Sequence, residues 1–293
     1  MSELRKPAWL KSQKLGARKA QEIIHNLRKY KLHTVCESAK CPNQGECFER
    51  GTATFMILGE VCTRNCTFCA VEKAISKLLP PDEKEPHSIA LLCKELNLKH
   101  VVITTVTRDD LPDGGANHFI KTMQEIRKNC ENNVTIELLT SDFNGDLDQV
   151  EAVAKAGPDV FNHNVETIPR LYSAVRTMAD FARSLSVLKK VKDIDPEMLT
   201  KSGFMVGLGE SKEEIVSLLK QLREIDVDLV TIGQYMAPSR KHYPVQEYVH
   251  PDIFKYYQDE GEKMGFAIVE SAPLVRSSFQ ADKARNLIKR SVE

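Results

Sequence analysis

The chain has 293 residues, 42% of them hydrophobic, and its 41 Lys and Arg are balanced by 41 Asp and Glu. This hydrophobic fraction is enough to build a core, which excludes wholesale disorder, and zero net charge argues against a general nucleic-acid coat. No run of about 18 apolar residues is present, so the sequence predicts no membrane-spanning helix.

Residues 1–31 are basic, and an amphipathic helix is predicted within residues 14–30, where apolar side chains recur on one stripe: Leu15, Ile23, Ile24 and Leu27. Two interpretations compete. One is an organelle presequence, which is Arg-rich and poor in acidic residues. The other, which we favour because Ser is scarce and Trp9 resembles a docking residue, is a helix that covers the core or meets an acidic partner. No secretory leader is recognisable.

From about residue 53, short apolar runs rich in β-branched residues alternate with helical patterns. Strands are predicted at 54–58, 100–105, 134–139, 159–163, 203–207 and 229–233, and helices at 89–96, 116–129, 147–156 and 212–225. Alternation of this kind predicts an α/β fold with a parallel sheet and right-handed crossovers. Six units are too few for the usual closed eight-stranded barrel, so a partial, open barrel or a doubly wound sheet remains.

Six of the eight cysteines lie between Cys36 and Cys69, whereas Cys93 and Cys130 stand alone. Clustered thiols in a reducing compartment more often bind metal or carry out redox chemistry than form disulfides. The two isolated cysteines lie on predicted helices, and we interpret them as structural thiols because free cysteine packs as a small apolar residue.

One triplet, Cys62, Cys66 and Cys69, has C-x3-C-x2-C spacing and follows the first predicted strand. Three thiolates on one short loop can bind three irons of a [4Fe–4S] cluster and leave the fourth iron open. A structural zinc site needs a fourth ligand nearby, and the nearest candidates, His33 and His87, lack finger-like spacing.

With Phe68 before its last cysteine, this loop resembles that of radical S-adenosylmethionine (SAM) enzymes. The resemblance implies a [4Fe–4S] cluster on Cys62, Cys66 and Cys69 whose open iron is chelated by SAM. One electron then cleaves the C–S bond of SAM and releases a 5′-deoxyadenosyl radical. The resemblance also implies a partial (βα)6 TIM-like barrel, in agreement with the six predicted units.

The other triplet, Cys36, Cys41 and Cys47, precedes the barrel, and by spacing alone it could be a zinc loop. Its surrounding sequence, residues 36–43, is similar to that of the lipoyl synthase family. Further matching stretches are 106–116, 161–167, 201–210, 231–235 and 273–278, so the resemblance covers residues 6–281. One departure is Phe279, where the family's Arg-Ser-Ser motif is usually followed by Tyr.

This resemblance implies insertion of two sulfur atoms at C6 and C8 of a protein-bound octanoyl group. Side-chain bases cannot deprotonate such C–H positions, so a radical cofactor must carry the step. The sulfur donor is implied to be an auxiliary [4Fe–4S] cluster on Cys36, Cys41 and Cys47. Its fourth ligand aligns with Ser278 rather than Ser277.

Weaker candidates would contact SAM. Asp113, Gly114 and Gly115 follow the second strand, where glycines would let the backbone approach the methionine amino group, although an ordinary turn explains them too. Asn164 and Glu166 could hold ribose hydroxyls. The remaining candidates are Arg176, for the cofactor carboxylate or a crosslinked intermediate, and residues 207–209 beside the adenine, whereas His163 is interpreted as a hydrogen-bonded strand-end histidine.

The expected organisation is an N-terminal extension with the auxiliary cluster loop (1–52), the radical SAM barrel (53–270) and a C-terminal tail (271–293). The implied partners are octanoylated carrier domains of 2-oxoacid dehydrogenase E2 subunits or the glycine-cleavage carrier protein. A ferredoxin or flavodoxin reductant and an iron–sulfur carrier are also implied, and a cytoplasmic location is expected. Two alternatives remain: a sulfur-inserting enzyme acting on a free small molecule, as biotin synthase does, and a zinc-binding interaction module.

Overall fold

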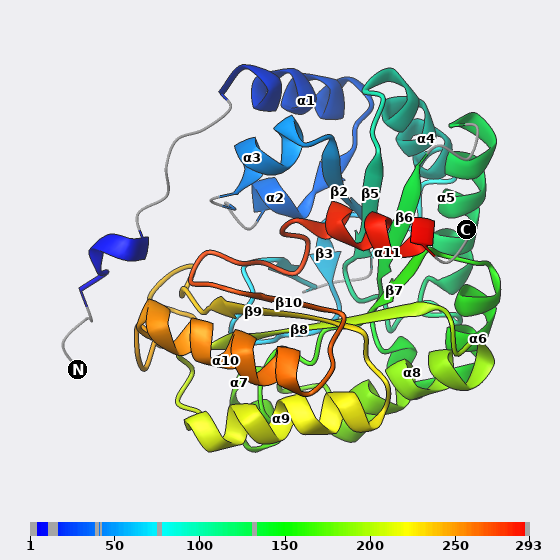
Figure 1. Ribbon diagram of the computed structural model, residues 1–293. Coiled ribbons are helices and arrows are strands. Elements are labelled where there is room, and N and C mark those ends of the chain that lie inside the picture. The colour runs from blue at the N-terminus through cyan, green and yellow to red at the C-terminus, as the bar shows by residue number, and fades with distance from the viewer. Residues whose placement is uncertain are drawn as a thin grey trace.

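The structure, a computed structural model, describes residues 5–10, 17–38, 41, 43–74, 78–130 and 134–290. Its centre is one sheet with the strand order β1-β2-β5-β6-β7-β8-β9-β10 (Figure 1). The strands are β1 (His33–Thr34), β2 (Thr52–Ile57), β5 (His100–Thr105), β6 (Thr135–Leu139), β7 (Val160–Asn162), β8 (Leu199–Val206), β9 (Leu229–Gln234) and β10 (Ile268–Ser271). A separate pair is formed by β3 (Val61–Cys62) and β4 (Glu72–Lys73).

The sheet is an open barrel. From β2 to β10 every neighbouring pair is parallel, and only β1 runs antiparallel to its neighbour β2. Among the described residues, β1 and β10 do not pair with each other, so the sheet has two edges. Strands β2 and β9 are buried along their whole length, as expected for parallel strands covered on both faces. The fold is therefore the predicted partial TIM-like barrel.

Helices follow the strands and cover the outer face of the sheet (Figure 1). They are α4 (Glu85–Glu95), α5 (Ala116–Asn129), α6 (Leu147–Lys155), α8 (Phe181–Ile194), α9 (Lys212–Glu224) and α10 (Pro251–Lys263). All six predicted strands and all four predicted helices are present, and β5 and α5 have the predicted bounds. The prediction omitted α8, α10 and β10. In the edge strand β10 only Val269 is buried, so it carries little apolar pattern.

Shorter elements complete the chain: η1 (Ala8–Leu10), α2 (Val35–Ser38), α3 (Gln44–Glu49), η2 (Phe143–Gly145), η3 (Pro169–Leu171), α7 (Tyr172–Val175), η4 (Ala281–Lys283) and α11 (Ala284–Arg290). The predicted N-terminal helix is α1 (Ala17–Lys29), which packs on α3 and buries Ile23 and Leu27 in the core. Leu15 lies outside the described residues. Trp9 is 42% exposed and its ring meets His250 edge-on.

The N-terminal and C-terminal parts both join the barrel. Through β1, the region before residue 53 belongs to the same sheet as β2. After β10, residues 272–290 return across the molecule, where η4 contacts β5 and Ala284 of α11 packs against Val160 and Leu229 (Figure 1). The boundaries at 52/53 and 270/271 therefore stay a proposal about organisation.

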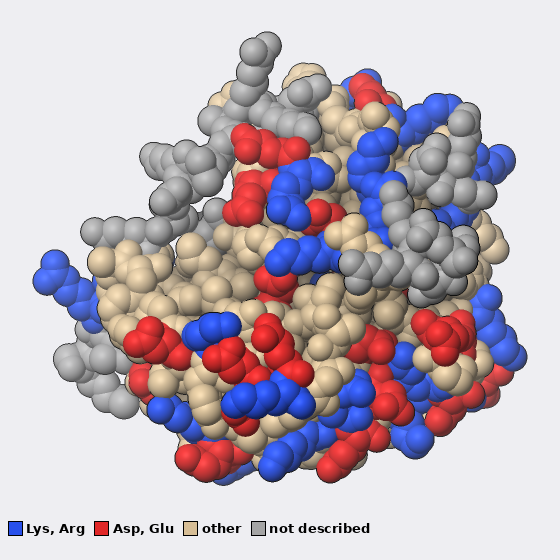
Figure 2. Space-filling model, viewed as in Figure 1, with Lys and Arg blue, Asp and Glu red and all other residues tan. Residues whose placement is uncertain are grey.

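The surface carries both charge signs throughout. Figure 2 shows Lys and Arg interspersed with Asp and Glu over the visible face, as expected from equal numbers of each. Over the part of the chain that is described, no helix is both long enough and apolar enough to cross a membrane.

Candidate active site

The cysteine loop after β2 lies at the C-terminal ends of the barrel strands. Thr63 N donates to Thr107 O (2.9 Å) after β5, and Thr67 N donates to Val175 O (3.0 Å) at the end of α7. Tyr243 N, after β9, donates to Thr67 O at 2.9 Å. In barrels of this kind ligands bind at this face, so the loop is in position to form an active site.

A buried arginine fixes this loop to two neighbouring strands. Arg64 Nε lies 2.8 Å from Asp109 Oδ2, and its Nη2 lies 2.5 Å from Asp142 Oδ1. Burial by itself raises the pKa of Asp142, but hydrogen bonds from Arg64 and its charge hold that pKa at about 2. The sequence analysis missed this clamp. The available signal was an aspartate following each of the second and third predicted strands.

The entrance to the loop is strained and held on both sides. Leu58 has a φ of 67°, a conformation that bulky residues rarely adopt. Its N–H donates to Glu85 Oε2 (2.9 Å), which also meets His118 Nε2 at 2.7 Å, and its carbonyl accepts from Arg108 Nη1 at 3.2 Å. Two buried charged side chains thus hold the backbone where β2 enters the loop.

The thiols of the second triplet are neighbours in a partly buried site. Burial raises the pKa of Cys66, an effect that the charge of Arg176 reduces. Burial, with smaller contributions from the nearby Cys66 and Cys62 thiols, raises the pKa of Cys69 to about 11. Phe68 packs against the apolar cluster around β8 and β9.

The first triplet has the same character. Burial, together with the neighbouring thiols of the triplet, raises the pKa of Cys36 and of Cys47 to about 12. Burial also raises the pKa of Cys41, and Arg276 opposes that shift. All of these cysteines are free. Three soft, mutually interacting thiols fit an iron–sulfur cluster, which would offset the charge of their thiolates.

Neither triplet is a closed ligand set in this structure. Among the described residues, no three His, Cys, Asp or Glu side chains are arranged to hold a metal ion. A structural zinc site at either triplet would need a fourth protein ligand, and metal analysis distinguishes that alternative from an iron–sulfur cluster.

The C-terminal motif packs against the first triplet. Asn43 Nδ2 donates to Leu274 O at 2.6 Å, and the Gln280 N–H lies close enough to the Cys47 thiol to lower its pKa. Ser277 Oγ is 2.9 Å from Asn164 Oδ1 and 3.2 Å from Asn162 Nδ2. The structure therefore brings together residues from the first triplet and the C-terminal motif, which are far apart in sequence.

The candidates after β7 gather near Cys66. The charges of Glu166 and Arg176 both act on the pKa of Cys66, and burial raises the pKa of Glu166 itself. Arg176 Nη1 donates to Tyr172 Oη (3.1 Å) and Ser184 Oγ (2.9 Å). Asn164 faces the C-terminal motif through Ser277.

The turn before α5 has a structural function of its own. Asp113 accepts hydrogen bonds from Gly115 N and Asn117 N, both at 2.9 Å, and so caps α5. Gly115 has a φ of 90°, and a Cβ there would lie 2.3 Å from Leu58 Cδ1. Capping and close packing thus account for Asp113 and Gly115, and contact of residues 113–115 with SAM stays a prediction.

Two further expectations concern residues that were predicted to have structural rather than catalytic roles. His163 is buried with Nδ1 3.0 Å from Thr140 O and Nε2 3.1 Å from Ser184 Oγ, so it is the hydrogen-bonded strand-end histidine that was predicted. Cys93 is fully buried on α4. The structure places the Cys130 thiol close enough to raise the pKa of Cys93, a proximity that the sequence did not reveal.

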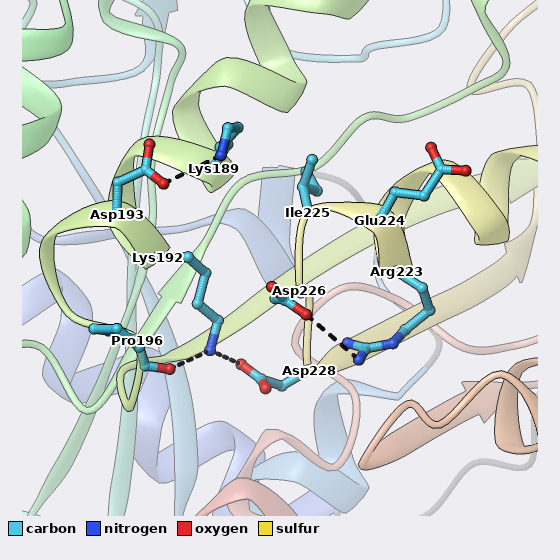
Figure 3. A pocket seen from close by; sticks show the side chains of 9 residues that line it. All are labelled: Lys189, Lys192, Asp193, Pro196, Arg223, Glu224, Ile225, Asp226 and Asp228. Atoms are coloured by element: carbon cyan, nitrogen blue, oxygen red, sulfur yellow. Dashed lines mark hydrogen bonds and ion pairs between the residues drawn. The ribbon is translucent and has the colours of Figure 1, made fainter.

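A cavity of about 380 Å³ lies at the other end of the barrel, between the C-terminal ends of α8 and α9 (Figure 3). Most of its charged groups are paired with one another: Lys192 Nζ lies 2.8 Å from Asp228 Oδ2, and Lys189 Nζ lies 3.2 Å from Asp193 Oδ1. These loops lead into the strands rather than out of them, so the cavity is separate from the cysteine site.

Comparison with known proteins agrees with this geometry. A family model described as "Radical SAM superfamily" matches residues 56–222. The fold is similar to methylornithine synthase, with a TM-score of 0.56 and 12% identity over 93% of this chain and 96% of that chain. It is also similar to Streptococcus suis SuiB bound to S-adenosylmethionine, with a TM-score of 0.58 and 15% identity over 89% of this chain and 58% of that chain. Barrel and cysteine loop together define a radical SAM protein.

Sequences much more similar than these structures identify the family within the radical SAM class. A lipoyl synthase from Caldanaerobacter subterraneus subsp. tengcongensis is 55% identical over 97% of this chain and 98% of its own length. A lipoyl synthase from Pseudomonas fluorescens is 51% identical over 98% of this chain and 84% of its own length. The chain belongs to the lipoyl synthase family, and this membership implies a [4Fe–4S] cluster and SAM as cofactors.

Proposed function

We propose that the chain inserts two sulfur atoms at C6 and C8 of a protein-bound octanoyl group, forming the lipoyl cofactor. The observation that carries this proposal is the packing of the C-terminal Arg276–Ser278 motif against the first cysteine triplet, on the same molecule as the radical SAM loop. A sulfur-inserting enzyme needs both a radical source and a sulfur source, and the two triplets supply one donor set for each.

The second triplet would hold the radical-generating cluster. Cys62, Cys66 and Cys69 provide three thiolates, and a [4Fe–4S] cluster with SAM, when bound there, supplies a 5′-deoxyadenosyl radical. Arg64 keeps the loop in place through Asp109 and Asp142, and the burial of its guanidinium excludes water from behind the loop.

Several side chains would orient SAM. Arg176 carries a buried positive charge toward the Cys66 side of the site, where it can pair with the cofactor carboxylate. Glu166 follows β7 and would offer oxygens to ribose hydroxyls, as would the remaining acceptor site of Asn164 Oδ1, which already accepts from Ser277 Oγ. Residues 113–115 would present backbone groups to the methionine amino group, while Asp113 caps α5.

The first triplet would hold an auxiliary [4Fe–4S] cluster as the sulfur donor. Its protein ligands would be Cys36, Cys41, Cys47 and Ser278. Ser277 is already occupied by hydrogen bonds to the barrel, whereas Ser278 Oγ has no hydrogen-bond partner within the described part of the chain. This difference supports Ser278 as the ligand. A hard serine oxygen is an unusual partner for iron–sulfur chemistry and suits a cluster that is consumed.

The substrate would be an octanoylated carrier domain, from a 2-oxoacid dehydrogenase E2 subunit or the glycine-cleavage system. A ferredoxin or flavodoxin would supply electrons, and an iron–sulfur carrier would rebuild the donor cluster in the cytoplasm. The basic N-terminal residues proposed to bind the carrier include Lys11 and Lys14, which lie outside the described residues.

Mass spectrometry of an octanoylated carrier after anaerobic turnover tests the function directly. Wild-type protein should add two sulfur atoms, and about eight irons per chain are expected for two four-iron clusters. Stoichiometric zinc without labile sulfide would contradict the proposal.

Two single substitutions separate the roles of the triplets. Cys66→Ala should abolish SAM cleavage because it removes a ligand of the radical-generating cluster. Cys41→Ala should retain reductive cleavage, measured as 5′-deoxyadenosine, yet form no lipoyl product. Cys93→Ala serves as a control, since that thiol only packs in the core. Lipoyl product from the Cys41→Ala protein would refute the assignment of the sulfur donor.

A further inference from the structure

The interior of the barrel contains a buried ion pair, where barrels of this type usually hold branched apolar side chains. Lys201 Nζ on β8 lies 3.0 and 3.1 Å from the two carboxylate oxygens of Glu137 on β6, and both side chains are almost fully buried. His100 Nε2 on β5 lies 3.6 Å from the same carboxylate. Burying two charges costs desolvation energy, and apolar side chains of similar size would often be at least as stabilising. The pair therefore suggests a function other than stability.

Asn162 connects this pair to the C-terminal segment. Asn162 Nδ2 donates to Glu137 Oε1 at 2.6 Å and to Ser277 Oγ at 3.2 Å. Ser277 Oγ in turn donates to Asn164 Oδ1 at 2.9 Å. The Ser277 hydroxyl thus accepts a hydrogen bond from Asn162, the last residue of β7, and donates one to Asn164, which follows it.

The charge of the acceptor strengthens this chain. Burial by itself raises the pKa of Glu137, but Lys201 and His100 hold it at about 2, so the carboxylate is ionised at neutral pH. A hydrogen bond to an ionised acceptor is roughly twice as strong as one between neutral groups. Asn162 is therefore held firmly in the orientation that meets Ser277.

Beyond Ser277 the segment turns toward the first triplet. Phe279 N donates to Arg276 O at 2.8 Å, which closes a turn around Ser277 and Ser278. The Gln280 N–H then reaches the Cys47 thiol, and the charge of Arg276 acts on Cys41. In sequence, Ser278 lies between Arg276 and Gln280.

We propose that Asn162, Glu137 and Lys201 are positioning residues that anchor Ser277 in the barrel and thereby hold Ser278 beside Cys41 and Cys47. The consequence for cluster ligation rests on the proposed function. The anchoring itself does not, because the hydrogen bonds are present without a cluster.

Hydrogen exchange on the metal-free protein tests the anchor. Ser277→Ala removes two hydrogen bonds, so the amides of residues 276–281 should exchange about tenfold faster. Asn162→Ala should act alike. Ser278→Ala is the matched control, since Ser278 is one residue away and its hydroxyl forms no hydrogen bond with the described residues. This variant should leave exchange unchanged, as should Ser186→Ala at an exposed position. Equal exchange in the Ser277→Ala and Ser278→Ala proteins would overturn the proposal.

The buried pair needs its own variants. Glu137→Gln leaves Lys201 unpaired and can unfold the protein, so the double variant Glu137→Gln, Lys201→Met removes both charges together. In the folded double variant the amides of residues 276–281 should exchange faster than in wild type. If these amides exchanged in the double variant at the wild-type rate, the ion pair would not be needed to anchor Ser277.

Cluster-loaded protein gives the second readout. Under a chelator, alkylation of Cys36, Cys41 and Cys47 should be about tenfold faster in Ser277→Ala than in wild type, while alkylation of Cys62, Cys66 and Cys69 stays unchanged. Equal rates at the first triplet would overturn the link from Ser277 to the ligand. If wild-type protein binds no iron at the first triplet, the proposed function fails instead, and the exchange experiment still decides the anchor.

Discussion

At the scale of single residues, buried charged side chains organise the mouth and the interior of this barrel. Arg64 binds two carboxylates, Arg108 and Glu85 hold the strained Leu58 backbone, and Lys201 pairs with Glu137. Each such group loses hydration on folding and is retained only with complete partners. Removing one member of such a pair should therefore destabilise the protein, because the other charge stays buried without its partner.

His163 predicts how stability depends on pH. Burial lowers its pKa to about 4, from 6.5 for the free side chain. Because the unfolded chain binds this proton more tightly, the free energy of unfolding should fall as pH drops from about 6.5 to about 4, by at most about 3 kcal/mol.

Urea unfolding of the metal-free protein at pH 7 and pH 5 measures this effect. The His163→Gln variant keeps hydrogen-bonding atoms but cannot titrate, so it should lose less stability over that interval. Other titrating groups act in both proteins and cancel in the difference. An identical pH dependence in the two proteins would show that His163 is not the group responsible.

At the scale of elements, the strand-to-helix turns are specified by glycines and caps. The turn into α5 brings Gly115 against Leu58, the residue that begins the cysteine loop. The position of the radical SAM loop therefore depends on the start of a helix that follows a different strand.

Gly115→Ala should destabilise the protein by about 2–4 kcal/mol, because a Cβ would both clash with Leu58 and strain the backbone at φ 90°. Gly157→Ala is the control. Gly157 has a φ of 77°, but no atom lies within 4 Å of the added Cβ, so only the backbone penalty of about 1 kcal/mol applies. The midpoints of urea unfolding compare the two, and equal losses would exclude the steric contribution.

At the scale of the whole molecule, the C-terminal segment spans the two sides of the open barrel. Arg50, before β2, pairs with Asp282 at 2.6 Å, and Lys283 pairs with Glu270 of β10. Between these strands the segment also carries the Arg-Ser-Ser motif past the first triplet. The segment thereby bridges the two sides of the open sheet and packs against the first triplet.

Truncation after Lys283 should lower the melting temperature, because α11 covers the apolar strand starts at Val160 and Leu229. The burial lost predicts roughly 1–3 kcal/mol. Asp282→Asn removes only a partly exposed ion pair and should cost less than about 1 kcal/mol. Calorimetry of the three metal-free proteins measures this. An unchanged melting temperature on truncation would mean that α11 contributes nothing to the core.

Much of the fold was predictable because parallel strands buried on both faces are short apolar runs that stand out locally. The cysteine triplets were equally visible, since the cysteines of each triplet lie only a few residues apart. Strand β10 was not predicted, because an edge strand with one buried residue has little pattern of its own. The clamp formed by Arg64 depends on side chains 45 and 78 residues away, and no local pattern reveals it.

The sequence by itself determined the radical SAM loop, the first cysteine triplet, the family resemblance and the alternating barrel, because each depends on residues that are close together in the sequence. Only the tertiary structure decided that Ser277 is anchored by the barrel while Ser278 is free among the described residues, and that Glu137 and Lys201 meet in the interior. These outcomes depend on which side chains the strand register places opposite each other. Adjacent serines of identical chemistry cannot be distinguished until that register brings Asn162 to one of them.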